Sequence, residues 1–485
     1  MMFSPRFLHG RKSLLLTLCL AASLTASAAP ITREQAMQQA AQFLNSRAGS
    51  RELTPVTGSR KLAPHHKASA TAHELYYVFN RGNAEGYIIV SGDDQTLPVL
   101  GYTDSGEFDY NTIPDNMRFW LDGRAKELAD LAEHPEAYAA APRRVVPTHP
   151  AIAKMCTSTW NQGDPYNQSC PMYFSLGRSV TGCVATAMAQ LLYYQRAKSV
   201  TEIQANIPAY TTWTAHPTYG NLSVPGVSKG APIDWDNMLN SYGSGATAKQ
   251  KKAVADLMMY CGVAVHMDYT NSSSGAQSSE VADAFKNYFG YGSQTRYVTR
   301  NSYSDEGWDA LIYGELSAGR PVYLSGANSE GGHAFVCDGY DGNHCYHINW
   351  GWGGGSDGFF LLSSLNPAQQ GIGGTGDGYN QYQDAVVGIE PVDFENKALP
   401  FSNAIAKRLC VEAFDANGDG TFTYGEAAAV KNLGTTFQEA KMTTFDELYY
   451  FTSLTALPDD AFQGCTALTS VKLPKRLSAI GTRAF

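Results

Sequence analysis

Residues 181–190 read TGCVATAMAQ, and the architecture of the chain is built around this segment. Over residues 182–197 the apolar side chains recur at helical spacing, which predicts a helix with one buried stripe. Cys183 stands in the predicted first turn, where unpaired backbone N–H groups lower a thiol pKa and favour the nucleophilic thiolate. Taken alone, however, a cysteine before an apolar helix is more often a small buried hydrophobic residue. The segment therefore needs partners elsewhere in the chain before it indicates catalysis.

Three other parts of the chain offer what a thiol nucleophile requires. His333, between glycines and a predicted strand, could act as the base. Asn349, at the end of the next predicted strand, could accept a hydrogen bond from the imidazole, and Trp352 could shield that bond from water. Gln162 could donate its amide N–H to a developing oxyanion. A lone strand-edge histidine would be interpreted as structural, but with Cys183 the set indicates thiol catalysis.

The order Gln, Cys, His, Asn-x-Trp is that of papain-like peptidases, and several longer segments resemble a narrower group. They are NQGDPYN (161–167), TGCVATAMAQ (181–190), GGHAFVCDGYDG (331–342), YHINWGWGGGSDGFF (346–360) and AVVGIEP (385–391). These segments resemble the streptopain family of secreted bacterial cysteine peptidases. VSGDDQTLPVLGYTDSGEFD (90–109) resembles the inhibitory prosegment of that family, so the likeness covers roughly residues 30–391.

The resemblance implies a role for each candidate residue. It makes Cys183 the nucleophile, His333 the general base and then acid, and Gln162 the oxyanion donor. Asn349 and Trp352 become the orienting and shielding pair. It also implies a cleft between a helical and a sheet half, endopeptidase activity on proteins or peptides, and no cofactor for catalysis.

Composition and the start of the chain narrow the class of protein. The 485 residues are 44% hydrophobic and 17% charged with net charge −9, which predicts a globular protein and disfavours nucleic-acid binding. Residues 1–28 are predicted to be a signal peptide, because basic residues precede the apolar run 13–24 and Ala-Ser-Ala follows at 26–28. No stretch approaches the ~20 apolar residues of a transmembrane helix. We expect a secreted or cell-surface-associated protein.

The remaining chain is expected to form an α+β zymogen with a small C-terminal region. The prosegment is assigned to residues 29–144, and the papain-like two-subdomain peptidase to residues 145–392. Within the prosegment, a helix, two strands and a second helix are predicted over 31–47, 74–94 and 116–132. The Pro-rich segment 139–150, with Arg143 and Arg144, predicts an exposed linker open to cleavage. In the second peptidase half, strands are predicted over 321–324, 334–339, 345–349 and 358–362, and a mobile glycine-rich loop over 368–380.

Residues 393–434 contain a twelve-residue stretch, 415–426, that matches an EF-hand-like calcium loop. Helices are predicted on either side of it, over 402–414 and 426–433. Its oxygen ligands would be Asp415, Asn417, Asp419, the carbonyl of Thr421 and bidentate Glu426. A solvated Asp/Asn/Gly turn is the alternative. A bound Ca²⁺ would be structural.

Residues 435–485 are predicted to begin a leucine-rich-repeat array. TALPDDAF at 455–462 recurs as SAIGTRAF at 478–485, a period of 23 residues. Two units cannot bury a solenoid core alone, so a truncated array is expected. Contact with a surface or host protein through these repeats follows as an expectation.

Two further cysteine and histidine patterns were weighed. Cys156 and Cys170 are close enough in sequence to pair in an oxidising compartment, with about even odds. His344, Cys345 and His347 have metal-ligand types, but neighbouring strand residues point to opposite faces, which disfavours a metal site.

The sequence therefore predicts a secreted cysteine endopeptidase made as a zymogen. One alternative is a surface adhesin that uses its repeats and carries an inert peptidase-like domain. Another is a Cys-His acyl-transfer enzyme of a transglutaminase-like or amidase fold. The complete set of candidate catalytic residues counts against the inert version.

Overall fold

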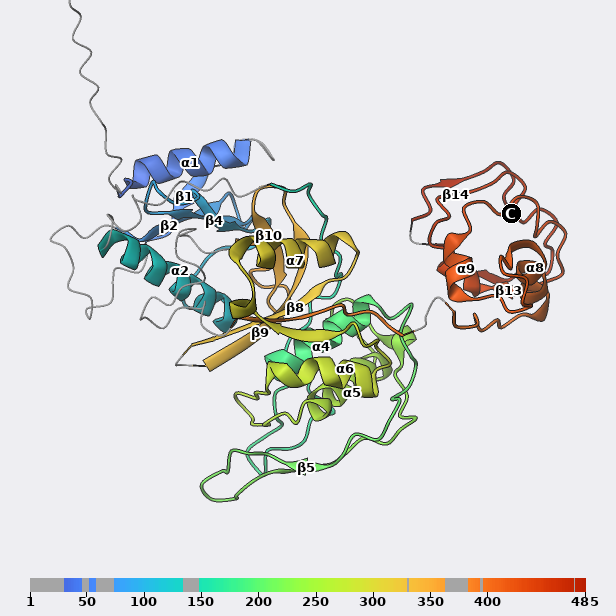
Figure 1. Cartoon of the computed structure of the whole chain (residues 1–485), viewed down its shortest axis with the longest axis horizontal. Coiled ribbons are helices and arrows are strands. Elements are labelled where there is room, and N and C mark those ends of the chain that lie inside the picture. The colour runs from blue at the N-terminus through green and yellow to red at the C-terminus, as the bar shows by residue number, and fades with distance from the viewer. Residues whose placement is uncertain are drawn as a thin grey trace, which may run out of the picture.

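The computed structural model describes residues 30–45, 52–57, 74–133, 148–328, 331–362, 383–392, 396–474 and 476–485 (Figure 1). The helices are α1 (Arg33–Asn45), α2 (Asp115–Glu133), α4 (Cys183–Tyr194), α5 (Ala248–Ala264), α6 (Val281–Tyr288), α7 (Asp305–Ser317), α8 (Ala404–Phe414) and α9 (Tyr424–Ala429). The predicted signal peptide, the linker cleavage site and the glycine-rich loop 368–380 lie outside the described residues.

One antiparallel ten-stranded sheet runs through the prosegment and the peptidase, in the order β1-β2-β3-β4-β11-β10-β9-β8-β12-β7. Its first four strands belong to the prosegment: β1 (Leu53–Pro55), β2 (Tyr76–Arg81), β3 (Tyr87–Ser91) and β4 (Val99–Tyr102). The other six are β7 (Arg296–Thr299), β8 (Val322–Asn328), β9 (Gly331–Tyr340), β10 (Cys345–Asn349), β11 (Gly358–Leu361) and β12 (Asp384–Val387). The strands predicted from alternating and β-branched patterns are confirmed.

The prosegment places one helix on each face of its part of the sheet. Successive strand residues point to opposite faces. On β2, Tyr76 and Val78 accordingly pack in the core that contains α2, whereas Tyr77 and Phe79 pack in the core that contains α1. Both predicted helices are confirmed, and α1 begins with the expected reciprocal cap. There the Gln35 amide N–H donates to Thr32 Oγ1, and the Thr32 N–H donates to Gln35 Oε1.

The junction between prosegment and peptidase is a strand pairing. β4 of the prosegment pairs antiparallel with β11 of the peptidase, with Phe359 opposite Tyr102 and Phe360 opposite Gly101. Gly101 is required here, because a Cβ at this position would lie 2.5 Å from the Phe360 ring. The hydrophobic core around α2 also contains Trp308 and Trp350 of the peptidase. The two parts therefore share both a sheet and a core.

The helical half of the peptidase packs on the opposite face of the sheet from α2. Its core is built around α4, with α5 and α6 beside it (Figure 1). The predicted helix over 182–197 is observed as α4, three residues shorter at its C-terminal end. A small two-stranded sheet of β5 (Tyr210–Thr211) and β6 (Ser223–Val224) extends this half. Among the described residues, no helix is long and apolar enough to cross a membrane.

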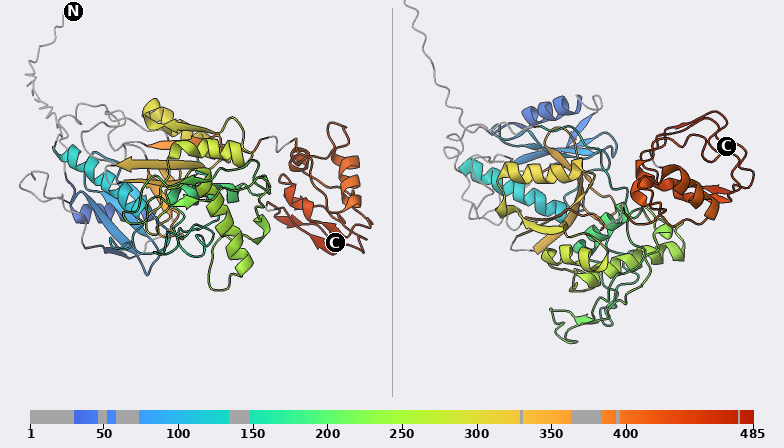
Figure 2. Two further views of the ribbon diagram at one scale, coloured as in Figure 1. Left: turned by 90° about the horizontal axis from the view of Figure 1, so that it is seen from below. Right: turned by 45° about the vertical axis from the view of Figure 1, so that its right-hand side comes forward.

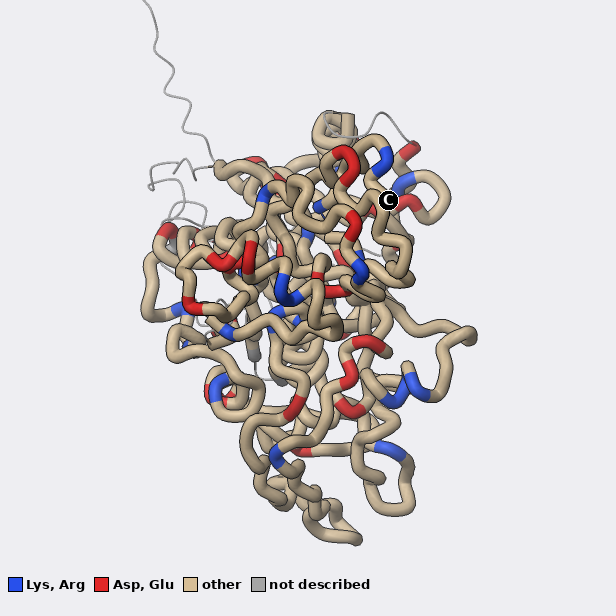
Figure 3. Tube along the Cα trace, turned by 90° about the vertical axis from the view of Figure 1, so that its right-hand side faces the viewer, with Lys and Arg blue, Asp and Glu red and all other residues tan. Residues whose placement is uncertain are grey.

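The C-terminal region has a hydrophobic core of its own, drawn from residues 399–484 (Figure 2). Short strands pair in parallel across successive coils. β14 (Ala456–Leu457) lies beside β16 (Ala479–Ile480) at an offset of 23 residues, and β13 (Thr444–Phe445) lies beside β15 (Ser470–Val471). The sequence period of 23 is therefore a structural repeat. Acidic and basic residues are interspersed on the face seen in Figure 3.

Candidate active site

Cys183 is the first residue of α4, and the preceding glycine makes that position accessible to the chain. Gly182 has a φ of 82°, and a Cβ there would lie 2.7 Å from the Met267 sulfur and 2.8 Å from the Ser274 carbonyl oxygen. The backbone N–H groups of Ala334, Val184 and Cys183 itself favour the thiolate, but burial has the larger effect and raises the thiol pKa. In this form of the protein the thiol is therefore held protonated.

His333 lies on β9, but its ring is engaged by the prosegment. The ring centroids of His333 and Phe119 of α2 are 5.3 Å apart in an edge-to-face arrangement. Burial lowers the imidazole pKa, which the nearby Asp115 carboxylate partly opposes. Its strand neighbour Ala334 packs in the core around α4, so alternation turns His333 toward α2. Within the described part of the chain, His333 and Cys183 share no hydrogen bond.

Gln162 is tied by its backbone to the segment that leads into α4. Its carbonyl oxygen accepts a hydrogen bond from the Thr181 N–H at 3.1 Å. Two residues earlier, the carbonyl oxygen of Trp160 accepts from the Gly353 N–H at 2.9 Å. The segment 160–162 thus lies between the start of the nucleophile helix and the loop after β10.

The expected orienting pair is not formed as predicted. The Asn349 carboxamide donates to the Ser158 carbonyl oxygen and accepts from the Gly351 N–H, and its remaining partner is Gln190. It makes no hydrogen bond to His333 in the described structure. Trp352 is 36% exposed, whereas Trp350 is fully buried and donates its indole N–H to the Ser356 carbonyl oxygen. The buried tryptophan of this loop is therefore Trp350, which the sequence argument did not select.

A second prosegment contact at the site was also missed from the sequence. The Asn116 side chain of α2 is fully buried and donates an N–H to the Trp350 carbonyl oxygen. No pattern in residues 115–133 distinguishes this asparagine from one on a solvated helix face. The contact places α2 across the loop that follows β10.

The other cysteine and histidine patterns are structural. Cys156 and Cys170 are both free and buried, so no disulfide joins them. The buried imidazole of His347 lies 2.5 Å from the Asp338 carboxylate, while His344 lies in the turn before β10. Among the described residues, no group of three or more histidine, cysteine or acidic side chains is arranged to hold a metal ion.

The predicted calcium loop joins α8 to α9, in the expected helix-loop-helix order. The Asp415 carboxylate accepts from the N–H groups of Gly418 and Gly420. The Glu426 carboxylate accepts from the Ala416 N–H and caps α9 through Thr423. The loop therefore has oxygen donors of the type that Ca²⁺ takes, but here they bind the loop's own amides.

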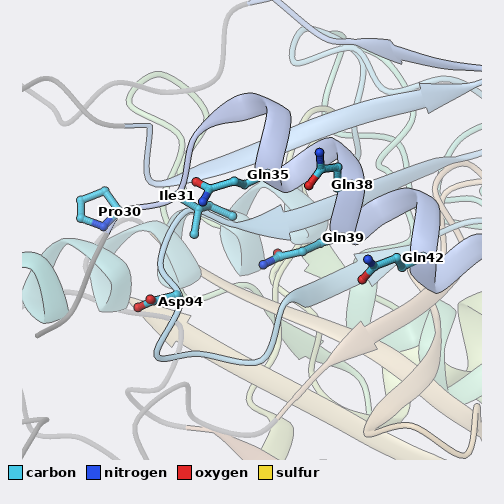
Figure 4. Close-up of a pocket in the computed structure, with 7 residues that line it drawn as sticks. All are labelled: Pro30, Ile31, Gln35, Gln38, Gln39, Gln42 and Asp94. Atoms are coloured by element: carbon cyan, nitrogen blue, oxygen red, sulfur yellow. The ribbon is translucent and has the colours of Figure 1, made fainter. Parts of the chain in front are cut away.

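One hollow lies away from these residues, on the α1 face of the prosegment (Figure 4). It has a volume of about 250 Å³ and is lined mainly by glutamine side chains of α1 and by Asp94. Because α1 and α2 cover opposite faces of the prosegment sheet, this hollow is separate from the Cys183 site.

Comparison with known proteins agrees with this arrangement. Residues 160–360 match the model of the peptidase C10 family, and residues 28–128 match that of the Spi protease inhibitor. Streptopain of Streptococcus pyogenes is 37% identical over 326 residues, which cover 65% of this chain and 80% of streptopain. The thiol protease/hemagglutinin PrtT of Porphyromonas gingivalis is 33% identical over 392 residues, which cover 79% of this chain and 44% of PrtT.

A solved structure extends the likeness to the prosegment. A fragment of prointerpain A from Prevotella intermedia superposes with a TM-score of 0.57 at 28% identity, covering 70% of this chain and 99% of that fragment. The fold and the matches define a papain-like cysteine peptidase with an inhibitor-like prosegment. The chain belongs to the peptidase C10 family.

Proposed function

We propose that this zymogen is a secreted endopeptidase in which Cys183 is the nucleophile and His333 the general base. The observation that carries the assignment is the position of Cys183, at the first turn of α4 with three backbone N–H groups around its sulfur. Helix N-termini favour a thiolate, and β9 supplies the histidine from the adjoining strand. Gln162 is proposed as the oxyanion donor, because its segment is bonded to the residues preceding Cys183.

The proposed reaction follows from these positions. His333 takes the proton of Cys183, and Sγ attacks the carbonyl carbon of the scissile peptide. The resulting oxyanion is bound by the Cys183 N–H and the Gln162 amide. His333 then donates its proton to the leaving amine, which departs and leaves a thioester. A water molecule, deprotonated by His333, hydrolyses the thioester and restores the thiol.

The zymogen would be latent because α2 takes two groups that this reaction needs. Phe119 packs on the His333 ring, and Asn116 occupies the Trp350 carbonyl at the adjoining loop. With the imidazole turned to α2, burial keeps the Cys183 thiol protonated. Cleavage within 139–150 is proposed as the step that allows α2 to leave.

The assignment is tested by making the wild-type chain and its Cys183→Ala variant separately. The wild type should shorten itself and then hydrolyse a protein substrate, whereas Cys183→Ala should stay at full length and be inactive. Cys465→Ala is the matched control, because Cys465 is also a free, partly exposed cysteine. Hydrolysis by purified Cys183→Ala would refute the assignment.

The oxyanion role has its own test in the matured enzyme. Gln162→Ala should lower kcat by ~10²–10³ with little change in KM, as expected for one oxyanion donor. A KM increase with unchanged kcat would instead make Gln162 a substrate-binding residue.

The C-terminal region supports a second, additional function. Its coils repeat at 23 residues, and β14 pairs in parallel with β16 at that offset. A relative matched over most of this chain is named a thiol protease/hemagglutinin. We propose that residues 435–485 belong to a leucine-rich-repeat binding region beside an active peptidase. Binding of a Cys183→Ala chain to host-protein arrays, lost on deletion of 435–485, would support this role; equal binding after deletion would refute it.

A further inference from the structure

Gln190 is a fully buried polar side chain on the nucleophile helix. It lies seven residues after Cys183 on α4, two helical turns away and on the same face of the helix. Its neighbours along α4 are apolar and buried, including Ala187, Met188 and Leu191. An amide in such surroundings is costly unless its hydrogen bonds are satisfied, so its partners indicate what it stabilises.

The Gln190 amide is bonded to two chain segments outside α4. Its oxygen lies within hydrogen-bonding distance of Ser158 Oγ (3.1 Å), the Trp160 N–H (3.3 Å) and Asn349 Nδ2 (3.0 Å). Its Nε2 donates to Asn349 Oδ1 at 3.0 Å. Asn349 Nδ2 in turn donates to the Ser158 carbonyl oxygen at 2.8 Å, which closes the network.

Each of these segments continues into the proposed site. From Trp160 the chain runs to Gln162, whose carbonyl oxygen binds the Thr181 N–H before Cys183. From Asn349 it runs to Trp350, whose carbonyl oxygen is held by the prosegment. One side chain thus connects the nucleophile helix, the oxyanion segment and the loop after β10.

The loop after β10 also packs directly on α4 beside Gln190. A Cβ at Gly351 would lie 3.2 Å from the Thr186 methyl carbon and 3.9 Å from Gln190 Nε2. The Gly351 N–H donates to Asn349 Oδ1, the same oxygen that accepts from Gln190. Because the loop is both packed and hydrogen-bonded there, a change at Gln190 would be transmitted to it.

We propose that Gln190 is a positioning residue that fixes the oxyanion segment and the Asn349–Gly351 turn relative to Cys183. The proposal rests on the catalytic roles proposed above. It gives the Asn349 carboxamide a different function from the expected one, because Asn349 joins α4 to the loop instead of orienting His333. A displacement of about 1 Å in such a framework is enough to cost ~10²-fold in rate.

The test uses full-length zymogens matured by tagged wild-type enzyme, which is then removed. Gln190→Met keeps the side-chain length and removes every hydrogen bond. Gln195→Met is the matched control, because Gln195 is a buried glutamine at the end of the same helix that bonds only the Ile389 carbonyl oxygen among its described partners. kcat and KM are measured well below the Tm of each variant.

We expect Gln190→Met to lower kcat by about 10- to 100-fold with KM within about twofold, while Gln195→Met retains the wild-type kcat. An unchanged kcat in folded Gln190→Met would overturn the proposal, as would an equal kcat loss in Gln195→Met. Cys183→Ala serves as the reference. If it hydrolyses substrate, the catalytic assignment itself fails; if only Gln190→Met behaves as wild type, the positioning role alone fails.

Gln190→Glu provides a readout that loss of packing would not reproduce. When protonated, the carboxyl offers one donor and one acceptor, as the amide does; when ionised, it cannot donate to Asn349 Oδ1 and repels it. Burial raises the carboxyl pKa, so kcat should fall with rising pH through an ionisation that is absent from the wild type. A kcat–pH profile parallel to wild type would overturn the proposal, and this arm decides alone if Gln190→Met does not fold.

Discussion

The prosegment and the C-terminal region are both attached to the peptidase, but the structure joins them to it in different ways. The prosegment extends the peptidase sheet through β4 and β11 and shares a hydrophobic core with it. The C-terminal region closes a core of its own from residues 399–484. A segment that completes another domain's sheet can control it, whereas a self-contained module can be added without altering the chemistry.

The largest expected difference is in the reactivity of Cys183 before and after maturation. In the zymogen burial raises the thiol pKa, so the thiolate fraction at pH 6 is small. Once α2 leaves and His333 can pair with the thiol, alkylation at pH 6 should accelerate by about 10²-fold or more. Peptide mapping identifies the labelled cysteine. Equal labelling rates in the two forms would contradict control by the prosegment.

A single prosegment residue should reproduce part of that change. Phe119→Ala removes the ring that contacts His333, and we expect Cys183 in the uncut zymogen to be alkylated about 10-fold faster at pH 6. Phe108→Ala is the control, because Phe108 is a buried prosegment aromatic that packs on Tyr87 and Tyr110. Equal acceleration in both variants would mean general loosening of the prosegment.

The shared core also predicts a pH-dependent stability. Burial raises the Asp357 pKa to about 7, and Tyr87 of the prosegment lies close to this turn. The folded chain then keeps a proton that the unfolded chain releases near pH 4, so this carboxyl costs stability as pH rises from about 4 to 7. Asp357→Asn can still accept from the Trp350 N–H.

We therefore expect the zymogen Tm of Asp357→Asn to exceed wild type by about 3–8 °C at pH 8, with the gain vanishing near pH 4. In the matured enzyme the gain should be smaller, because β11 is no longer covered. A gain independent of pH would show that Asp357 is not the titrating group.

The smallest expected effect on hydrolysis comes from the C-terminal region. If Ca²⁺ binds the Asp415–Glu426 loop, chelation should expose residues 396–433 to added protease and change peptide hydrolysis by less than twofold. Calorimetry measures the uptake, and Glu426→Gln should weaken it. A loss of hydrolysis on chelation would contradict the independence of this module.

The sequence predicted the elements that follow a regular period. The helix at Cys183, the strand carrying His333 and the 23-residue repeat were all visible as spacing. The choice of Trp352 over Trp350 failed in a loop where Gly351 and Gly353 have φ of 75° and 71°, so strand alternation does not apply.

Side-chain partners could not be predicted in the same way. An asparagine carboxamide bonds whichever groups the fold brings near, so the residue type at Asn349 could not distinguish His333 from Gln190. The pairing of β4 with β11 joins strands more than 250 residues apart, and neither strand differs in sequence from an exposed edge. These contacts depend on tertiary packing, which local patterns do not contain.

The β4–β11 pairing also bears on when activity would begin. A cut in the linker breaks one peptide bond and none of the strand or core contacts, so it converts an intramolecular association into a complex of two chains. Its dissociation then depends on concentration, because the tether no longer maintains a high effective concentration of prosegment. A concentrated sample would stay inactive after cutting, and dilution would start the reaction.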